Sequence, residues 1–468
     1  MDVSDPSDGG ANLRRSGDVI FRLLTLIVIL SPLPLGSIKP WAWSLEGLLV
    51  SALLLAWLAR MYWEGKNQRV SLSAIRWAAY PYLAVLGWSL FQAYVPVPGF
   101  MAHPAWEEAS KALGYPLKSR ISSDPEATKS AFVNLACYGA VFYLFLQLTD
   151  DRKRAKSLYM TITGASAAYA IYGIIEYSSG GKSLLWYDLK EFTHGHAVRG
   201  TFVYKNAFAT YTGLGLLCLL TLVSGKLAHM ALSLQSRNMT TRERSEVYSQ
   251  IFPHAMVFAV LFAALTLSMS RAGFILSCLA AGIYITYNAR NLGWSFKSAL
   301  IPLAALLISG LLYHFMAGAM ERRFGLIEKD SESRENIYEM TIRGILDAPI
   351  TGVGHGSFEN NIKAYYPNGY TKNVNTAHNV YLEAAFELGI PAAALLCVSI
   401  FSIGSICARG ATAKRTRLWS YGAAGVSSVT LIALHSWVDF SIQIPAVAIT
   451  FAAITGAACA RSLRHKTG

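Results

Sequence analysis

The chain has 468 residues, of which 53% are hydrophobic and 15% are charged, and its formal net charge is +13 at neutral pH. Long apolar runs recur along its whole length, which indicates a polytopic helical membrane protein rather than a soluble one. The basic excess does not indicate nucleic-acid binding, because it is concentrated in short segments between apolar runs. All six cysteines lie in apolar runs and none forms a CxxC pair, so neither a disulfide nor a zinc site is expected.

A polar tail precedes the apolar runs. Residues 1–17 are rich in Gly, Ser and Asp, and we expect them to form a disordered cytoplasmic tail. Residues 18–468 are expected to form a single all-α transmembrane domain of about 12 helices, because each run is close to the ~20 residues that a bilayer requires. The seventh and eighth runs are so close together that one broken pair is an alternative. The expected spans are 19–36, 42–62, 77–97, 130–149, 158–178, 205–224, 252–270, 272–289, 298–317, 379–407, 418–437 and 441–460.

The distribution of lysine and arginine predicts the orientation. One set of short loops, which includes both chain ends, holds a clear excess of these residues. The positive-inside rule therefore places both termini in the cytoplasm. The long loops, about 98–129, 179–204 and 318–378, then face outward. The loop 98–129 is rich in proline and is expected to be irregular rather than helical, and its last part, Ser122 to Glu126, has the composition of a helix N-cap leading into the fourth span.

Two cationic segments are candidates for phosphate binding. Arg199 and Lys205, with the amide of Asn206, lie at the outer end of the sixth span, where the two cations could hold phosphate oxygens. Anchoring at the membrane interface by snorkelling is the alternative. Arg271 falls between two apolar runs with little loop around it. An ionisable group at bilayer depth costs at least ~2.5 kcal/mol, which favours a functional role, and a simple turn residue in the headgroup region is the alternative.

A third cation lies in the long outer loop. Ser333 could cap a following helix and place Arg334 close to a helix N-terminus, where phosphate is attracted. A solvated surface arginine is the alternative. The acidic run of Glu328, Asp330 and Glu332 could chelate a divalent metal, but a mobile acidic loop is the better interpretation, so no metal site is predicted.

The most distinctive stretch runs from residue 351 to 395. Gly352, Gly354 and Gly356 occupy alternate positions, which suits backbone that approaches another group closely or takes a positive φ. His378 lies where the chain re-enters the membrane, and an imidazole there can exchange protons near neutral pH. The alternative is a glycine-rich loop followed by an interfacial histidine without chemistry.

Acidic and amide residues accompany this histidine. Asn379 follows it directly. Glu383 and Glu387 are one helical turn apart but point away from the histidine around a helix, so any residue that orients the imidazole must come from another span. His435 and Asp439 are four residues apart and could hydrogen-bond if their segment is helical. A capping aspartate beside a membrane-edge histidine is the alternative.

Several familiar motifs are absent from the sequence. It has no Walker loop, no dinucleotide fingerprint and no Gly-x-Ser-x-Gly elbow. It also has no Asp-x-Asp pair of the kind that holds a metal–nucleotide-sugar. The outward cluster consists of arginines, a histidine and one aspartate, which suits binding a diphosphate and removing a proton. That chemistry requires no metal, and no cofactor is expected.

Taken in order, these segments resemble the O-antigen ligase and polymerase superfamily. The resemblance extends from about Arg199 to Pro445. Five pieces carry it: Arg-Gly-Thr-Phe…Lys-Asn, Ser-x-Ser-Arg-Ala-Gly, Ser-Arg…Tyr followed by Pro-x-Thr-Gly-Val-Gly-x-Gly-x-Phe, Ala-His-Asn-x-Tyr-Leu-Glu…Glu-Leu-Gly, and His-Ser-x-Val-Asp-Phe…Ile-Pro. Each piece alone is a weak signal, but their order and their membrane-consistent positions make a strong one.

The resemblance implies a bacterial inner-membrane glycosyltransferase of the C type with a large periplasmic loop. Such an enzyme transfers a glycan from undecaprenyl diphosphate to an acceptor hydroxyl in cell-surface polysaccharide biosynthesis. The acceptor is lipid A–core in the ligases of lipopolysaccharide biosynthesis, a lipid-linked repeat unit in polymerases, and a protein serine in a third group. By resemblance, Arg271 and Arg334 correspond to the essential arginines of the family, His378 to its essential histidine and Asp439 to its acidic position.

The expected mechanism is metal-independent and inverting. Arg271 and Arg334 clamp the diphosphate, and His378 takes the proton from the acceptor as general base. Substrate binding is expected to involve Arg199, Lys205, Asn206, Gly354, Gly356 and Asn379. The long proline-rich loop 98–129 favours an O-antigen or exopolysaccharide polymerase nearly as much as a ligase. A transporter of lipid-linked sugar is less favoured, because the charges cluster at one edge and no internal repeat is visible.

Overall fold

A computed structural model describes residues 6–65, 68–180, 183–185, 187–188, 197–235, 241–291, 300, 304, 307–308, 328–413 and 419–463. Over these ranges the regular secondary structure is helical apart from one small hairpin, in which β1 (Ser183–Leu184) pairs antiparallel with β2 (Tyr187–Asp188). Eight of the described helices are long and apolar enough to cross a bilayer. This confirms the predicted all-α polytopic membrane architecture, whereas the count of about twelve spans stays a prediction.

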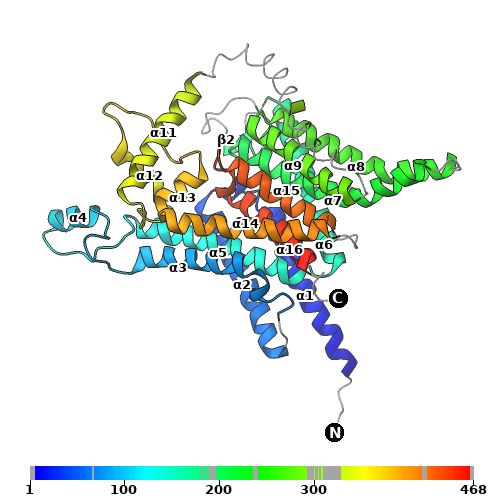
Figure 1. The fold of residues 1–468 in the computed structure, drawn as a ribbon, viewed down its shortest axis with the longest axis horizontal. Helices are drawn as coiled ribbons and strands as arrows, with labels where there is room; N and C mark the ends of the chain where they lie inside the picture. Colours follow the sequence, from blue (N-terminus) through cyan, green and yellow to red (C-terminus); the bar gives the residue numbers. More distant parts are fainter. Residues whose placement is uncertain are drawn as a thin grey trace, which may run out of the picture.

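The long helices form one bundle (Figure 1). They are α1 (Pro6–Leu30), α2 (Pro40–Glu64), α3 (Arg76–Tyr94), α5 (Pro125–Leu148), α6 (Arg152–Ser178), α7 (Lys205–Gln235), α8 (Thr241–Leu267), α9 (Arg271–Asn291), α14 (Ile390–Thr412), α15 (Trp419–His435) and α16 (Pro445–Leu463). Shorter helices are α4 (Ala105–Leu113), α11 (Glu328–Asp347), α12 (Phe358–Asn361), α13 (Val380–Leu388) and the 3-10 turns η1 (Leu35–Ser37), η2 (Leu72–Ile75), η5 (Ile362–Tyr365) and η6 (Ser441–Gln443). Figure 1 shows α11, α12 and α13 gathered at one end of the bundle.

Two helices form the centre of the bundle. In the apolar windows of α7 and α16, 89% and 94% of the residues are buried, against 17% in α8. Small residues let α16 and its neighbours approach closely: a Cβ added at Gly456 would lie 2.5 Å from the carbonyl oxygen of Phe142 on α5. The outer helices instead expose apolar side chains such as Leu48 and Phe252, as expected for surfaces that face lipid. The site described below therefore adjoins the two most buried of the described membrane-length helices.

Asp18 of α1 and the end of α16 lie on one face of the bundle, which we call the terminal face. Arg154 at the start of α6 binds Asp18 of α1, with 2.8 Å between Nη2 and Oδ1. On the same face, Arg461 near the end of α16 donates a hydrogen bond to the carbonyl of Asp150. Because α16 begins at the opposite face, immediately after the turn between α15 and α16, that turn faces away from the terminal face. Assignment of the terminal face to the cytoplasm stays a prediction.

Two expectations differ from the structure, and a third is not tested by it. Helix α1 begins at Pro6, so the part of the expected disordered tail from 6 to 17 is helical, because no proline interrupts the helix upstream of the apolar run. The loop 98–129 contains α4, which forms in its proline-free middle part with acidic residues in the first turn and Gly114 as a left-handed C-cap. The expected span 298–317 lies almost entirely outside the described residues.

The expected tenth span, 379–407, is two helices rather than one. Gly389 (φ 80°, ψ 157°) separates α13 from α14, and Pro391 lies in the first turn of the second helix. Proline fits the first turn of a new helix but cannot continue an existing one. Only α14 has the length and hydropathy of a membrane span. Helix α13 packs with α11 and the glycine-rich loop beyond the end of the bundle.

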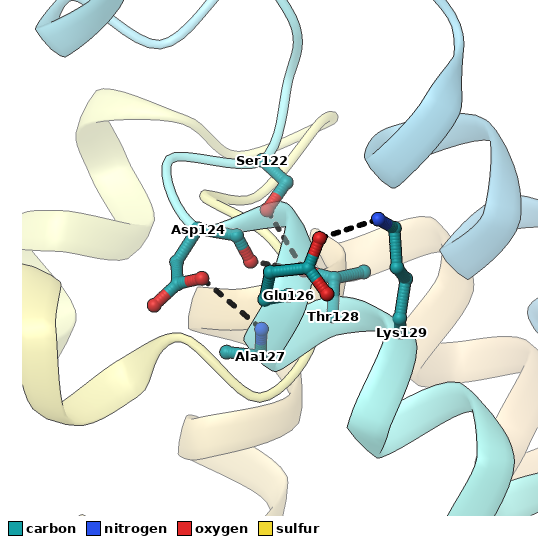
Figure 2. A network of polar contacts seen from close by, with 6 residues as sticks. All are labelled: Ser122, Asp124, Glu126, Ala127, Thr128 and Lys129. Carbon is teal, nitrogen blue, oxygen red and sulfur yellow. Dashed lines mark hydrogen bonds and ion pairs between the residues drawn. The ribbon is translucent and has the colours of Figure 1, made fainter.

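The expected N-cap at the start of the fourth span is confirmed (Figure 2). Asp124 Oδ1 accepts a hydrogen bond of 3.1 Å from the N–H of Ala127, and the hydroxyls of Ser122 and Thr128 are 2.8 Å apart. The neighbouring Ser123 N–H donates to the carbonyl of Val353 at 3.0 Å. The start of α5 therefore supports the glycine-rich loop.

Candidate functional site

The turn between α15 and α16, residues 436–444, is the centre of the candidate site. Its Asp439 is 2% exposed. Asp439 Oδ1 accepts a hydrogen bond of 2.9 Å from Asn206 Nδ2 at the start of α7, and Oδ2 accepts a short one from the hydroxyl of Ser441. With both oxygens engaged, the carboxylate holds a fixed position between α7 and the turn.

The junction of α8 and α9 joins this network. Ser270 Oγ donates a hydrogen bond of 2.8 Å to Asn206 Oδ1. Arg271 follows directly as the first residue of α9, and its side chain is exposed. The residue therefore lies at the rim of the bundle, in agreement with the turn alternative, but the turn carries it next to the Asp439 network. The amide of Asn206 links the α8–α9 junction to the turn between α15 and α16, because its oxygen binds Ser270 and its nitrogen binds Asp439.

Helix α11 covers the turn from outside the bundle. Arg334 Nη1 donates a hydrogen bond of 3.2 Å to the carbonyl of Val438, and Tyr338, one helical turn further on, donates to the carbonyl of His378 at 3.4 Å. Burial raises the pKa of Tyr338, and the charge of Arg334 opposes that rise. Because α11 already begins at Glu328, Arg334 is inside the helix, and its expected place at a helix N-terminus is wrong.

His378 is held in an unusual backbone conformation. Its φ is +52°, in the left-handed region that non-glycine residues seldom adopt. The flanking Val380 N–H donates to the carbonyl of Ser436 at 2.9 Å, and the imidazole packs edge-on against the Phe440 ring with centroids 5.2 Å apart. Such strain persists only where several contacts fix the backbone, and it is frequent at functional sites.

Asn379 has a structural task in this arrangement. Its Oδ1 accepts hydrogen bonds from the N–H groups of Tyr381 and Leu382 at 3.0 and 3.1 Å, so it is the N-cap of α13. The side chain is 5% exposed. A contribution of Asn379 to substrate binding stays a prediction, and the sequence reading missed its capping role.

The Arg199–Asn206 segment borders the same turn. The Tyr204 ring packs edge-on against Phe440 at 4.9 Å, and the Val198 N–H donates to the carbonyl of Leu267 at 3.0 Å, next to the α8–α9 junction. Arg199 is 5% exposed, and burial lowers its pKa. It is therefore a buried cation and not a snorkelling anchor, whereas Lys205 at the start of α7 is exposed.

The glycine-rich loop approaches other parts of the protein itself. Gly352, Gly354 and Gly356 all have positive φ, as expected. A Cβ added at Gly354 would lie 2.8 Å from the Cβ of Ser122, and one at Gly356 would lie 2.7 Å from the Cβ of Ala131. The observed contacts therefore explain Gly356 by packing against α5 and Gly354 by packing against Ser122 just before α5, and a role for Gly354 and Gly356 in substrate binding stays a prediction.

His355, in the middle of this loop, is buried against α3. Its imidazole Nδ1 lies 2.9 Å from the hydroxyl of Ser89, and its backbone N–H donates to Gln92 Oε1 at 3.2 Å. Burial lowers its pKa to about 4, so the imidazole is neutral at physiological pH. His355 belongs to the fold of the loop and not to the cluster around Asp439.

The structure also corrects one expected pair. His435 and Asp439 are joined through the backbone, where the Asp439 N–H donates to the His435 carbonyl at 2.9 Å. The His435 imidazole instead places Nδ1 2.6 Å from the hydroxyl of Thr210 on α7. The acidic run from Glu328 to Glu332 has its side chains outside the described residues, so its interpretation is untested.

A large apolar cavity opens beside the candidate site. It has a volume of about 1050 Å³ and is lined mainly by apolar residues of α2, α3, α5, α14 and α16. Its polar lining residues include Glu383, Gln443, Asn375 and His355, and Val380 of the His378 segment also lines it. The cavity suits an apolar chain whose polar end meets the turn region.

The functional residues that could not be singled out from the sequence are those that hold the candidate site residues in place. Ser270, Ser441 and Tyr338 all lie within the recognised motifs, so the motif pattern itself was the available signal. The partners of Ser270 and Tyr338 lie 64 and 40 residues away in the chain, and the network joins Asn206 to Asp439 across 233 residues. Contacts over such a separation follow from packing and cannot be deduced from spacing.

The fold and site define a polytopic helical membrane protein with a cluster of cationic, imidazole and carboxylate groups at one end of its bundle. A family model described as O-antigen ligase matches residues 255–397, so the match to this part of the chain supports the O-antigen ligase family. The matched range includes Arg271, Arg334 and His378, whereas Arg199 and Asp439 lie outside it. No curated protein matches the chain. The family supports a ligase-like or polymerase-like glycosyltransferase function.

Proposed function

We propose that this protein transfers a glycan from undecaprenyl diphosphate to an acceptor hydroxyl on the periplasmic face of the bacterial inner membrane. The observation that carries this proposal is the meeting of three segments at one turn. Arg334 contacts Val438, the His378 segment binds Ser436 and packs against Phe440, and the α8–α9 junction reaches Asp439 through Asn206. Cations, an imidazole and a fixed carboxylate thereby share one end of the bundle.

The two arginines supply the binding site for the diphosphate. Arg271 is exposed at the rim, and Arg334 is half-buried above the turn. Guanidinium groups bind phosphate oxygens by charge-assisted hydrogen bonds, and they stabilise the charge that develops as the bond between the sugar and the diphosphate breaks. Arg199 and Lys205 border the same turn and add positive charge near the lipid headgroups.

His378 removes the proton from the acceptor hydroxyl. A neutral imidazole next to the leaving diphosphate acts as general base, an effect that typically contributes about 10²–10⁴-fold to the rate. Attack from the side opposite to the diphosphate inverts the anomeric centre. Asp439, with both oxygens hydrogen-bonded, fixes the turn from which the Val438 carbonyl reaches Arg334.

The isoprenoid tail of the donor binds in the apolar cavity. Its lining consists mostly of apolar side chains from membrane helices, and Val380 and Glu383, close to His378 in the chain, are among the lining residues. The basic terminal face points to the cytoplasm under the positive-inside rule, so the site faces outward. Nucleotide sugars are confined to the cytoplasm, and a lipid-linked diphosphate is therefore the energy-rich donor that can reach this side.

Two related functions differ in their products. A ligase adds a glycan to lipid A–core, whereas a polymerase extends a lipid-linked repeat unit, and both use the same donor chemistry. The helix α4 in the loop 98–129 enlarges the outward side of this protein, which is where an acceptor would be selected. A transporter of lipid-linked sugar would move its substrate across the bilayer and would form no new glycosidic bond.

Reconstitution in liposomes tests the proposal. Purified protein receives a glycan on undecaprenyl diphosphate together with either lipid A–core or the same lipid-linked unit, and the product is identified by mass spectrometry. We expect a new glycosidic bond, with about 10²-fold or greater loss in Arg334→Gln and Arg271→Gln. Arg343→Gln is the matched control, because Arg343 lies on the same helix α11 but pairs at the surface with Glu339. Translocation without bond formation, or full transfer by Arg334→Gln, would contradict the proposal.

A further inference from the structure

Helix α13 carries two buried acids that the proposed chemistry does not use. Glu383 and Glu387 are 6% and 7% exposed. They are one helical turn apart, so their side chains lie on the same side of the helix. Burial raises the pKa of both carboxyl groups, and the neighbouring Glu383 adds to the rise at Glu387. Two acids held away from water at this cost call for a structural or functional reason.

Glu383 bridges the two segments that carry His378 and Asp439. Its Oε2 accepts a hydrogen bond of 2.7 Å from the N–H of Ala377, the residue directly before His378. Its Oε1 accepts a bond of 2.8 Å from Nε2 of Gln443, in the same turn as Asp439. One carboxylate therefore ties the backbone of the imidazole segment to the turn that the arginines contact.

The backbone of His378 needs such a tie. A residue with a Cβ in the left-handed region is strained, and His378 adopts φ +52°. Three hydrogen bonds hold this conformation: Ala377 to Glu383, Val380 to Ser436, and Tyr338 to the His378 carbonyl. The bond to Glu383 is the only one of these three that fixes the chain on the N-terminal side of the histidine.

Glu387 has a different partner and so provides a comparison. Its Oε1 accepts a hydrogen bond of 3.0 Å from the N–H of Phe358, in the segment that follows the glycine-rich loop. Within the described part of the chain, its carboxyl group forms no hydrogen bond to the His378 segment or to the turn, and its burial is close to that of Glu383. Substitution of Glu387 therefore controls for the general effect of altering a buried acid on α13.

We propose that Glu383 is a positioning residue, which fixes His378 against the Asp439 turn by accepting hydrogen bonds from the Ala377 N–H and from Gln443. The inference rests on the proposed function, in which the imidazole reacts. Glu383 acts through its two acceptor oxygens and takes no proton from substrate. The bridge spans 66 residues, from Ala377 to Gln443, and so joins two family motifs that the sequence leaves separate.

Substitutions separate this role from that of an acid or base. In Glu383→Gln the amide oxygen still accepts from Ala377, and its NH₂ can donate to Gln443 once the Gln443 amide turns over. We expect turnover within about threefold of the parent protein. Glu383→Leu removes both acceptors, and we expect kcat to fall about 10-fold to 100-fold with little change in KM for the donor, because misplacing a reacting group by ~1 Å has effects of this size.

Gln443→Leu should reproduce part of the loss. Because Gln443 acts through Glu383, the double variant Glu383→Leu with Gln443→Leu should be no slower than Glu383→Leu alone. Glu387→Leu should lower the melting temperature without the selective fall in kcat. If Glu383→Gln is as slow as Glu383→Leu, the carboxylate itself is required, and the positioning role is refuted.

A second readout does not depend on catalysis. With His378→Cys as the background, the rate of labelling by a membrane-impermeant maleimide reports how firmly this position is held. We expect Glu383→Leu to speed labelling about tenfold, and Glu383→Gln and Glu387→Leu to leave it within about twofold. Unchanged labelling in Glu383→Leu would overturn the inference. Failure of the parent protein to transfer glycan, with labelling changed as expected, would instead remove only the proposed reaction.

Discussion

The role of His378 can be tested with a set of substitutions chosen for its backbone. Since its φ is +52°, replacement by alanine removes the imidazole and keeps the strain of a Cβ in the left-handed region, about 1–2 kcal/mol. Glycine removes that strain, and asparagine tolerates the region better than most residues. The imidazole is therefore lost in all three variants His378→Ala, His378→Asn and His378→Gly, whereas the strain of the left-handed backbone conformation differs among them.

We expect all three variants to lose turnover by about 10²–10⁴-fold, the usual contribution of a general base. Stability should instead follow the backbone, with His378→Gly more stable than His378→Ala by about 1 kcal/mol in the free energy of unfolding. Turnover is measured in liposomes with the lipid-linked donor, and stability by thermal unfolding in detergent. Added imidazole should restore part of the turnover in His378→Gly, because removal of the histidine side chain leaves space for an imidazole molecule.

The result that refutes this reasoning is turnover that follows stability. If His378→Asn or His378→Gly transferred glycan within about tenfold of the parent protein while His378→Ala did not, the imidazole would be dispensable. The backbone conformation would then be the requirement, and the base would have to be sought elsewhere around the turn.

Two further predictions concern the glycine-rich loop. Burial lowers the pKa of His355 to about 4 from the ordinary 6.5, so the unfolded chain binds a proton at this imidazole before the folded protein does as the pH falls. The free energy of unfolding should therefore drop between pH 6.5 and 4, by about 2 kcal/mol at pH 5. In His355→Gln the melting temperature should change less with pH over this range. Gly354→Ala meets Ser122 and has φ +116°, so it should destabilise the protein by about 2–4 kcal/mol, whereas Gly369→Ala, with φ +81° and nothing within 4 Å of the added Cβ, should cost about 1 kcal/mol.

Each of these two predictions would be contradicted by a specific result. Equal pH dependence of melting in the parent protein and in His355→Gln would mean that His355 is not the group that titrates. Equal destabilisation by Gly354→Ala and Gly369→Ala would mean that the contact with Ser122 contributes nothing beyond the cost of the backbone conformation.

The sequence by itself determined where apolar helices form and where several of them end. The runs were long enough to be recognised because hydropathy is a local property of about 20 consecutive residues. The Asp124 cap was predictable for the same reason, since donor and acceptor are three residues apart. The close approach of α8 and α9 around Arg271 also followed from the short gap between their apolar runs.

Local signals failed where tertiary contacts compete with them. The apolar run that begins at 379 read as one span, but Gly389 and Pro391 divide it, and its first part folds with α11 outside the bundle. Arg334 read as a residue near a helix N-terminus, but α11 begins at Glu328. In both cases the pattern gave the type of element correctly and its boundaries wrongly.

What only the tertiary structure decided is which residues meet. Asn206 reaches Asp439 across 233 residues, Arg334 reaches Val438 across 104, and Glu383 reaches Gln443 across 60. Periodicity along one helix does not tell which neighbour that helix packs against. The composition of the cluster could therefore be read from the motifs, whereas its geometry depends on the packing of α7, α15 and α16, which brings distant turns to the same end of the bundle.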